Sequence, residues 1–428
     1  MSNLSDRLSR LTPEQRLLLE RRLQKAAPSP AKAEGGEASA LSSRETEERS
    51  NRSPGEARTP PRSAGRRALS FSLFYFASAE TQGGDRWRLL FEGAKLADRH
   101  GFEAVWTPER HFHPFGGLYP NPAMTSAALA MVTERVQLRA GSVVLPLHHP
   151  IRVAEDWSLA DNYSRGRTGI AFASGWHPDD FVFFPDHYAE RRDVMFEGIE
   201  TIRRLWRGDA VTAKGGVGQE VLVRLYPRPV QPELPVWITA AASSNTVLKA
   251  GEIGANLLVN LLGQSLEGVA EKVRQYRESR AGAGHDPETG RVTLMLHTFL
   301  GDDPDAVLET VRAPFTRYLR SFGGLLENLA RSRRQPGESR TITEEDKEQV
   351  LAYAVERYVR DSALFGTPRT CMEMVRHLEE IGVDEVACLI DFGIDVETTL
   401  AGLERLHRLQ ELARRSSAAP TLMTREGP

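Results

Sequence analysis

The 428-residue sequence has almost no cysteine and no long apolar run. Its two cysteines, Cys371 and Cys388, are too few for a disulfide framework, and no Cys/His spacing indicates zinc, so we expect no bound metal. No apolar stretch is long enough to span a bilayer, and the polar start MSNLSDRLSR is not a signal peptide. We therefore expect a cytoplasmic protein without a membrane partner.

The sequence also lacks an excess of charge and the common nucleotide motifs. A formal net charge of −3 gives no support for a nucleic-acid partner, which usually needs a strongly basic face. No GxGxxG follows the first predicted strand, and GxxxxGK before Ser or Thr is absent, which argues against Rossmann-type NAD(P)H binding and ATP hydrolysis. Without Gly-x-Ser-x-Gly, a serine hydrolase is not expected either.

Composition divides the chain into four segments. Residues 1–27 have leucines at helical spacing and the helix-start signal TPEQ, which predicts a helical leader that docks on a partner, on its own barrel or in a dimer. Residues 28–68 are rich in Ser, Pro, Glu, Arg and Gly and are expected to be a disordered linker. Residues 69–415 form the main domain, and residues 416–428 are expected to be a flexible tail.

Apolar strands alternate with helices about eight times in the main domain, which favours an α/β fold of the closed (β/α)8 TIM-barrel type over an open doubly wound sheet. Residues 211–229 are expected to be a hairpin insertion. In such barrels, ligands bind where the strands end. The predicted strands are residues 68–78, 102–106, 136–145, 168–173, 235–239, 255–260, 292–300 and 384–390.

The turn after residues 235–239 has the composition of an anion site. The strand ends in small residues, and Ser243, Ser244, Asn245 and Thr246 then open a helix. Small side chains let a ligand approach the backbone, and hydroxyls with free N–H groups at a helix start attract phosphate. Alternatively, Ser243 or Ser244 is simply the helix N-cap.

Several motifs together resemble the bacterial luciferase-like FMN-dependent monooxygenases. They are PERHFHPFGGLYPNP, VLPLHHPIRVAEDW, DNYSRGRTGIAFASGWHPDDF and AAASSNT, within a similarity that covers residues 69–414. GGLYPNP and ASGWHPDDF resemble the subgroup associated with nonribosomal peptide and polyketide biosynthesis. The resemblance implies a (β/α)8 barrel that takes reduced FMN at its mouth, O2 as co-substrate and a separate flavin reductase as partner. We also expect a homodimer.

The resemblance also implies cofactor contacts. Ser243 and Thr246 match phosphate-contact positions, and Ser142–Val143 lies where many members have a non-prolyl cis peptide behind the flavin ring. Ser174 replaces a phosphate-binding Arg of luciferase, which puts that contact in doubt. The implied cofactor-binding residues are Ser142, Val143, Ser174, Gly175, Trp176, Ala242, Ser243, Asn245 and Thr246.

The loop that reads Glu-His-His in luciferase reads Glu109-Arg110-His111 here. Because Arg stays protonated, it cannot be a base, and we expect His111 or His113 to handle protons near the flavin; a structural hydrogen-bonding role is the alternative. Arg110 could recognise an anion such as a carrier-arm phosphate, or pair with Glu109 or a neighbouring carboxylate. The residues expected to contact substrate are Tyr75, Glu109 and His177.

The sequence therefore predicts a two-component monooxygenase. By the resemblance, reduced FMN reacts with O2 to give a C4a-peroxyflavin, which oxygenates a natural-product intermediate by hydroxylation or Baeyer–Villiger insertion. The substrate is expected to be an amino-acyl, peptidyl or polyketidyl group on a carrier protein, with the leader as docking element. The alternatives are a deazaflavin-dependent dehydrogenase or reductase on the same barrel, and a non-catalytic flavin-binding scaffold.

Overall fold

The computed structural model describes residues 68–76, 86–114, 116–240, 243–261, 264–332, 352, 355–356 and 358–418. The predicted leader at 1–27, nearly all of the linker at 28–68 and the tail from residue 419 lie outside the described residues. Among the described helices, none combines the length and hydropathy that crossing a bilayer requires.

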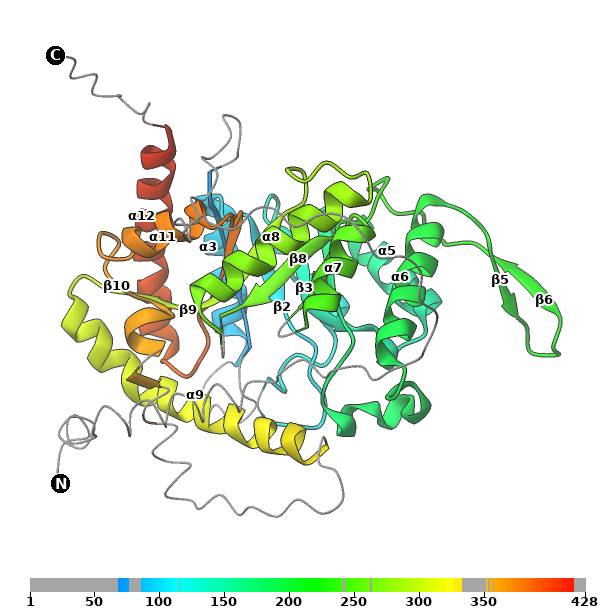
Figure 1. Cartoon of the computed structure of the whole chain (residues 1–428), viewed down its shortest axis with the longest axis horizontal. Helices are drawn as coiled ribbons and strands as arrows, with labels where there is room; N and C mark the ends of the chain where they lie inside the picture. Colours follow the sequence, from blue (N-terminus) through cyan, green and yellow to red (C-terminus); the bar gives the residue numbers. More distant parts are fainter. Residues whose placement is uncertain are drawn as a thin grey trace, which may run out of the picture. The chain divides into compact units, whose positions relative to one another are not determined.

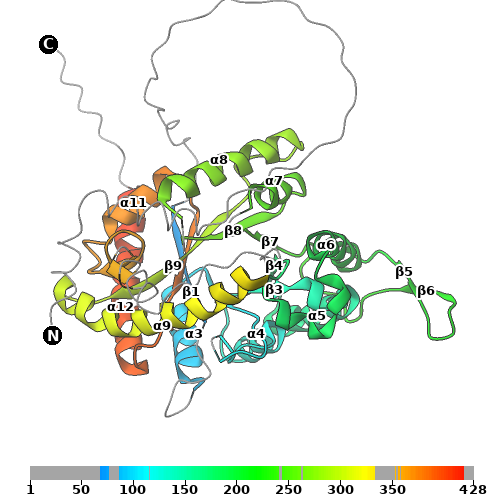
Figure 2. The same ribbon diagram turned by 60° about the horizontal axis from the view of Figure 1, so that its bottom comes forward.

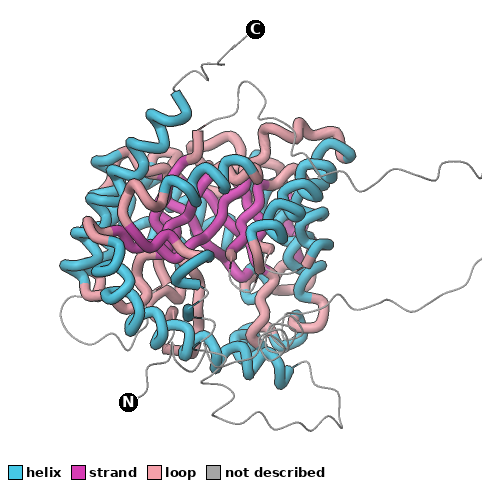
Figure 3. The backbone as a smooth tube through the Cα atoms, turned by 60° about the vertical axis from the view of Figure 1, so that its left-hand side comes forward, coloured by secondary structure: helices cyan, strands magenta, loops and turns pink. Residues whose placement is uncertain are grey.

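Eight parallel strands close into a barrel, which confirms the predicted fold class. They follow one another around the ring in sequence order, and β1 pairs with β11 through Ser70 and Glu385 to close it. Figure 3 shows these strands inside a layer of helices. The barrel strands are β1 (Ser70–Phe74), β2 (Ala104–Thr107), β3 (Gln137–Val144), β4 (Thr168–Ala173), β7 (Val236–Thr239), β8 (Asn256–Asn260), β9 (Val292–Leu300) and β11 (Glu385–Leu389).

The helices pack around this barrel (Figure 1). The predicted insertion is the antiparallel hairpin of β5 (Val211–Lys214) and β6 (Glu220–Val223), which projects from the body. The short strand β10 (Leu364–Gly366) beside β9 was not predicted. The helices are α3 (Arg88–His100), α4 (Pro122–Ala130), α5 (Pro150–Ser164), α6 (Arg191–Arg207), α7 (Ser244–Glu252), α8 (Leu266–Gly282), α9 (Pro304–Ser332), α11 (Met372–Glu380) and α12 (Val396–Ala418).

Local sequence signals start several of these helices. The Asn121 side chain accepts a hydrogen bond from the Met124 N–H, and Pro122 occupies the first turn of α4. The His149 ring accepts from the Ile151 N–H at the start of α5, where Pro150 again fixes the first turn. These caps determine where the helices begin and therefore where the loops after β2 and β3 end.

Helix α9 covers the carboxyl end of the barrel. One apolar cluster joins Phe74 and Trp237 of the strands to Val311 and Phe315 of α9. Figure 2 shows α9 passing across the strands. This packing removes apolar side chains from water on both sides of the contact. The barrel mouth is thus partly closed by a segment that lies between β9 and β10 in the chain.

A buried ion pair fills the amino-terminal half of the barrel. The carboxylate of Glu385 lies 2.8 Å from Arg139 Nη1 and accepts a hydrogen bond of 2.9 Å from the Trp106 indole. The Arg139 guanidinium lies over the rings of Trp106 and Trp237, at 5.1 and 4.5 Å from their centroids. Burial opposes ionisation of Glu385, but Arg139 and Arg291 outweigh it and lower its pKa below the ordinary value.

Replacing Glu385 with Ala should lower the free energy of unfolding by about 3–5 kcal/mol, because Arg139 then stays buried with only the partly exposed Glu103 as its counter-charge. Urea midpoints followed by circular dichroism measure this loss. As a control, Glu271→Ala removes a partner of the exposed Arg274 and should change the midpoint little. Equal midpoints for the two variants would contradict the structural role assigned to the Glu385 pair.

Candidate functional site

Glu109 is the centre of a hydrogen-bonded cluster at the carboxyl end of β2. Its Oε1 atom lies 2.7 Å from His111 Nε2 and 2.5 Å from His148 Nε2. Its Oε2 atom accepts a hydrogen bond of 2.7 Å from the backbone N–H of Val144. The Glu109 side chain is 1% exposed. One carboxylate therefore joins the loop after β2 to the end of β3 and to the loop that follows it.

The electrostatics of this cluster favour an ionised Glu109 and a protonated His148 relative to the free groups. Burial alone would raise the pKa of Glu109, but hydrogen bonds from His111 and His148 outweigh burial and lower it. Burial alone would lower the pKa of His148, but its hydrogen bond and charge interaction with Glu109 raise it. The cluster can therefore keep a proton on His148 beside an ionised carboxylate, next to His111.

The same three groups are close enough to consider a metal ion. One ligand atom from each of Glu109, His111 and His148 lies within 4.8 Å of the others. The direct hydrogen bonds already give Glu109 three partners, which accounts for the arrangement without a metal ion. The prediction of no bound metal remains a prediction.

Arg110 lies beside this cluster in a second buried pair. Its Nη1 atom donates to Asp180 Oδ2 at 2.6 Å, and the Arg110 side chain is 4% exposed. His177 Nδ1 lies 3.6 Å from Asp180 Oδ1, and Arg110 lies 5.8 Å from the centroid of the Trp176 ring. Of the two partners expected for Arg110, an anionic ligand or a neighbouring carboxylate, the structure shows the carboxylate, which is Asp180 on the loop after β4.

Strand β3 carries a cis peptide bond between Gly141 and Ser142. The expected position, Ser142–Val143, is one bond too far along the chain. The pairing of β3 with β4 shifts register between Gly141 and Val143, so the irregularity centres on Ser142. Ser142 Oγ lies 2.6 Å from Thr239 Oγ1 of β7. A Cβ at Gly141 would lie 2.6 Å from the ring of Phe74, so this position requires glycine.

Ser243 occupies the N-cap position of α7, but its side chain makes no capping hydrogen bond. Its hydroxyl and the first N–H groups of the helix are therefore available to an anion. Ser244 and Asn245 are exposed, and Thr246 is half-buried. Ala242, also predicted to contact the cofactor, lies outside the described residues.

The loop after β4 brings the remaining predicted cofactor residues near the Arg110 pair. Ser174 and Trp176 are half-buried. Gly175 has a φ of 76°, and a Cβ there would lie 2.8 Å from Val144. Glycine is thus needed both for the left-handed backbone and for the close approach to β3.

Tyr75 and Val143 do not face the barrel interior, which corrects the prediction that Tyr75 reaches the substrate. Tyr75 is fully buried, and its hydroxyl donates to the Leu89 carbonyl and contacts Gly93 of α3. Val143 belongs to the same outer cluster between strands and helices, so only its backbone is placed to back a ligand.

The predicted substrate residues Glu109 and His177 are both buried. Both Glu109 oxygens have partners in His111, His148 and Val144, and its contact with substrate stays a prediction. His177 lies beside Asp180, and the half-buried His113 is close enough to lower the pKa of His177 in addition to burial and Arg110.

Two residues of the site were not among those predicted from the sequence. His148 forms a hydrogen bond with Glu109, and Asp180 accepts one from Arg110. His297 on β9 is packed against Phe315 and Phe392, and burial lowers its pKa to about 3. A sequence shows that loops share one end of a barrel, but not which side chains meet there.

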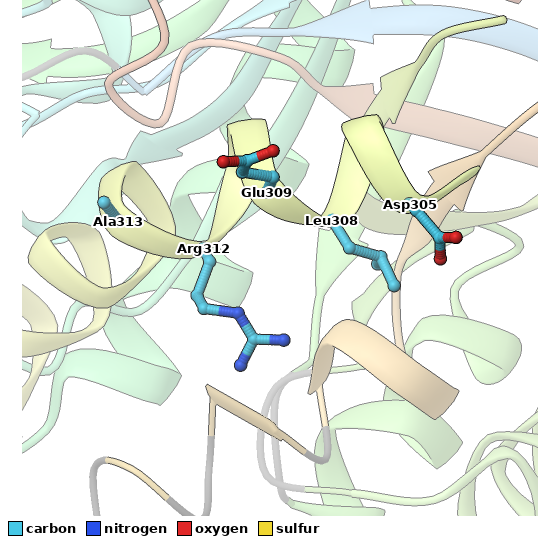
Figure 4. Close-up of a pocket in the computed structure, with 5 residues that line it drawn as sticks. All are labelled: Asp305, Leu308, Glu309, Arg312 and Ala313. Atoms are coloured by element: carbon cyan, nitrogen blue, oxygen red, sulfur yellow. The ribbon is translucent and has the colours of Figure 1, made fainter. Parts of the chain in front are cut away.

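A separate surface pocket of about 460 Å³ lies along α9. Figure 4 shows its lining side chains on successive turns of that helix. No predicted site residue lines it, and its Arg312 is paired with Glu356. The lining residues are Asp305, Leu308, Glu309, Arg312 and Ala313.

Comparison with known proteins identifies relatives of this barrel. Residues 67–385 match the family described as luciferase-like monooxygenase. The flavin-dependent trigonelline monooxygenase, oxygenase component, of Acinetobacter baylyi is 29% identical over 345 residues, which is 79% of this chain and 93% of the relative. The 4-hydroxyprotoasukamycin monooxygenase of Streptomyces nodosus subsp. asukaensis is 28% identical, over 70% of this chain and 79% of the relative.

A solved structure agrees with these relatives at the level of the fold. The oxygenating constituent of 3,6-diketocamphane monooxygenase of Pseudomonas putida, a Baeyer–Villiger enzyme in complex with FMN, has a TM-score of 0.63 to this chain. It is 18% identical, and the similarity covers 80% of this chain and 97% of that one. At this identity, the likeness supports the barrel architecture alone.

Replacing Glu109 with Gln should remove a stabilising interaction that is complete between pH 4.5 and 6.5. The lowered pKa of Glu109 gives stability above the unfolded value of 4.5, and this is lost as the pH falls through the folded pKa. The raised pKa of His148 gives stability below 6.5, and this is lost as the pH rises through the folded pKa. Urea midpoints of both proteins measured below, within and above this range test the coupling: the difference should be largest within the range and shrink on both sides of it, and a difference that stays the same at every pH would contradict it.

Proposed function

Because the chain belongs to the luciferase-like monooxygenases, a family of flavin-dependent enzymes, we propose that it is the oxygenase component of a two-component system. The observation that carries this proposal is the family match over residues 67–385, which includes every loop of the site described above. The Acinetobacter baylyi relative bears the name of an oxygenase component. In this proposal, a separate reductase supplies reduced FMN, and O2 is the co-substrate.

The residues at the barrel mouth fit FMN. The uncommitted hydroxyl of Ser243 and the N–H groups that open α7 would hold the phosphate, with Asn245 and Thr246 beside them. The backbone at Gly141–Ser142 and the loop at Gly175 would lie against the ring system. Gly141 and Gly175 have no Cβ that would hinder a close approach, and the Ser142 side chain reaches Thr239 across the barrel. Reduced FMN, when bound, would supply the electrons that activate O2.

In this proposal, the residues of the chain itself move protons and keep water out of the site. His111 is held by Glu109, whose pKa is lowered and which also holds His148, so His111 can take or give a proton while the carboxylate stays ionised. Helix α9 covers the barrel mouth with apolar side chains. A covered site keeps water away from reactive species and strengthens local electrostatics.

The substrate in this proposal is a natural-product intermediate carried as an amino-acyl, peptidyl or polyketidyl thioester, with the leader at 1–27 as docking element. Hydroxylation and Baeyer–Villiger insertion are both open. The relative named for 4-hydroxyprotoasukamycin is compatible with a role in biosynthesis. Exposed apolar side chains on α4 and α5, such as Met124 and Tyr163, support the expected homodimer.

Supplied with reduced FMN and isotopically labelled O2, the protein should add one labelled oxygen to a suitable carrier-bound intermediate, which mass spectrometry detects. With NADPH and oxidised FMN alone it should be inactive until a flavin reductase is added. Robust activity without a reductase would contradict the two-component proposal. Turnover only with a reduced deazaflavin, and without O2 consumption, would instead favour a dehydrogenase.

A His111→Ala variant tests the proposed role of His111 in the same assay. It removes one imidazole from Glu109 and leaves the α7 terminus and the Arg110–Asp180 pair in place. FMN binding should therefore persist, and labelled product should fall roughly 100-fold, as expected for loss of a general acid–base group. Unchanged turnover would remove His111 from the mechanism.

Deleting residues 1–67 should impair activity on the carrier-bound substrate and spare activity on a small-molecule mimic. The reason is that a docking helix adds affinity only for the carrier, through effective concentration. Rates on both substrates, measured with the full and shortened chains, test this. Equal loss on both substrates would indicate that the leader stabilises the protein instead.

A further inference from the structure

The Arg110 pair leaves polar atoms without partners inside the protein. Ten buried side-chain nitrogen and oxygen atoms lack a hydrogen-bond partner among the described residues, and half of them belong to three neighbouring side chains. They are Arg110 Nε and Nη2, His177 Nδ1 and Nε2, and Asp180 Oδ1. Buried polar atoms are almost always paired, because an unpaired one loses its hydration without compensation. Two of the five, His177 Nδ1 and Asp180 Oδ1, face each other at 3.6 Å, beyond hydrogen-bond length, so Arg110 Nε, Arg110 Nη2 and His177 Nε2 are the atoms that another group would complete.

The free atoms of Arg110 have the geometry of an oxyanion receptor. Nη1 is engaged by Asp180 Oδ2 at 2.6 Å, which leaves the edge formed by Nε and Nη2. This edge offers two parallel N–H donors that match the two oxygens of a carboxylate or two oxygens of a phosphate. The ring of Trp176 lies over the guanidinium at 5.8 Å and limits its movement.

The charge balance permits an added anion. Asp180 is faced by Arg110, His111, Glu109, Asp179 and His177. Burial raises its pKa to about 6 even though Arg110 opposes this shift. Near neutrality the carboxyl can therefore take up a proton, after which Oδ1 or Oδ2 donates instead of repelling. Burial, followed by Arg110, lowers the pKa of His177, so its ring is neutral and offers one N–H.

The position of these three side chains relates them to the substrate more closely than to the cofactor phosphate. Arg110 directly precedes His111, the proposed proton carrier, whereas the anion site at Ser243 opens α7 after a different strand. An apolar rim adjoins these side chains, since the exposed Phe183 lies 5.1 Å from the His111 ring, and Phe112 packs against Phe183 at 5.5 Å. A ligand with an oxyanion and an apolar body matches both features.

We propose that Arg110, His177 and Asp180 form a buried subsite for an oxyanion, a carboxylate or phosphate, carried by the substrate. The assignment of this anion to the substrate rests on the proposed monooxygenase function. The subsite would fix the orientation of the substrate relative to His111, and Arg110 would determine the preference for anionic over neutral substrates.

The test measures ligand binding by calorimetry on the FMN-saturated protein, with benzoate and inorganic phosphate as probes and benzamide as the neutral match of benzoate. Arg110→Met should weaken binding of the anionic probes about tenfold or more, because it removes both free donors. Arg110→Lys should recover part of the affinity, since it restores charge without the two parallel donors. Arg152→Met, which removes an exposed charge on α5, should change nothing.

Asp180→Asn distinguishes a binding role from a structural one. It removes the competing carboxylate and keeps its shape, so the anionic probes should bind more tightly. The variant should also lose the decline in affinity that we expect of the wild type as the pH rises through about 6. A merely structural pair would not give tighter binding. If Arg110→Met does not fold, the Asn and Lys variants still decide the question.

Three results would overturn the proposal. The first is that neither anionic probe binds the wild type measurably. The second is that Arg110→Met binds the probes as well as the wild type does. Either result would mean that water, and not an anion, pairs with the free atoms of Arg110 and His177. The third is that Arg110→Met weakens binding of FMN but not of riboflavin, which lacks the phosphate. That result would assign Arg110 to the cofactor phosphate instead of the substrate. None of these measurements requires turnover, so failure of the monooxygenase proposal would appear separately, as absence of labelled product.

Discussion

The pairing of Glu385 with Arg139 inside the barrel decides where a ligand can lie. Ion pairs in a barrel core are costly to desolvate, and this one is supported by the Trp106 indole and by two aromatic faces. Together these side chains fill the amino-terminal half of the barrel. The space that loops can surround is therefore at the carboxyl ends of the strands, and Glu109, Arg110, Ser142 and Ser243 all lie at that end.

At that end, charged side chains organise loops that have little regular structure of their own. Glu109 connects the segments after β2 and β3, and Asp180 connects the segment after β4 to Arg110. Each connection is a buried carboxylate with at least one partner on a different segment of the chain. The chemistry and the shape of the site thus depend on the same contacts, so a substitution that alters proton control also alters how the loops are held.

The fold could be read from the sequence, whereas the side-chain pairs of the site could not. Alternating apolar strands and amphipathic helices predicted the barrel, and the bounds of β4 and β9 agree with the prediction. The direction of Tyr75 was wrong because strands of a parallel barrel are apolar on both faces, so alternation does not show which face is inside. Asp180 and His148 were missed because their partners are distant in sequence, and the cis bond was misplaced by one residue because a register shift leaves no mark in composition.

The cover formed by α9 has a consequence for how the protein can be altered. Its apolar residues contact the inner barrel cluster, but none of the groups around Glu109 comes from it. The volume above the barrel and the proton-holding cluster are therefore encoded by separate stretches of chain. Changing the side chain of Val311 would alter this cover and leave the groups around Glu109 as they are, whereas Phe315 also packs against His297, so a change there alters the surroundings of that imidazole as well.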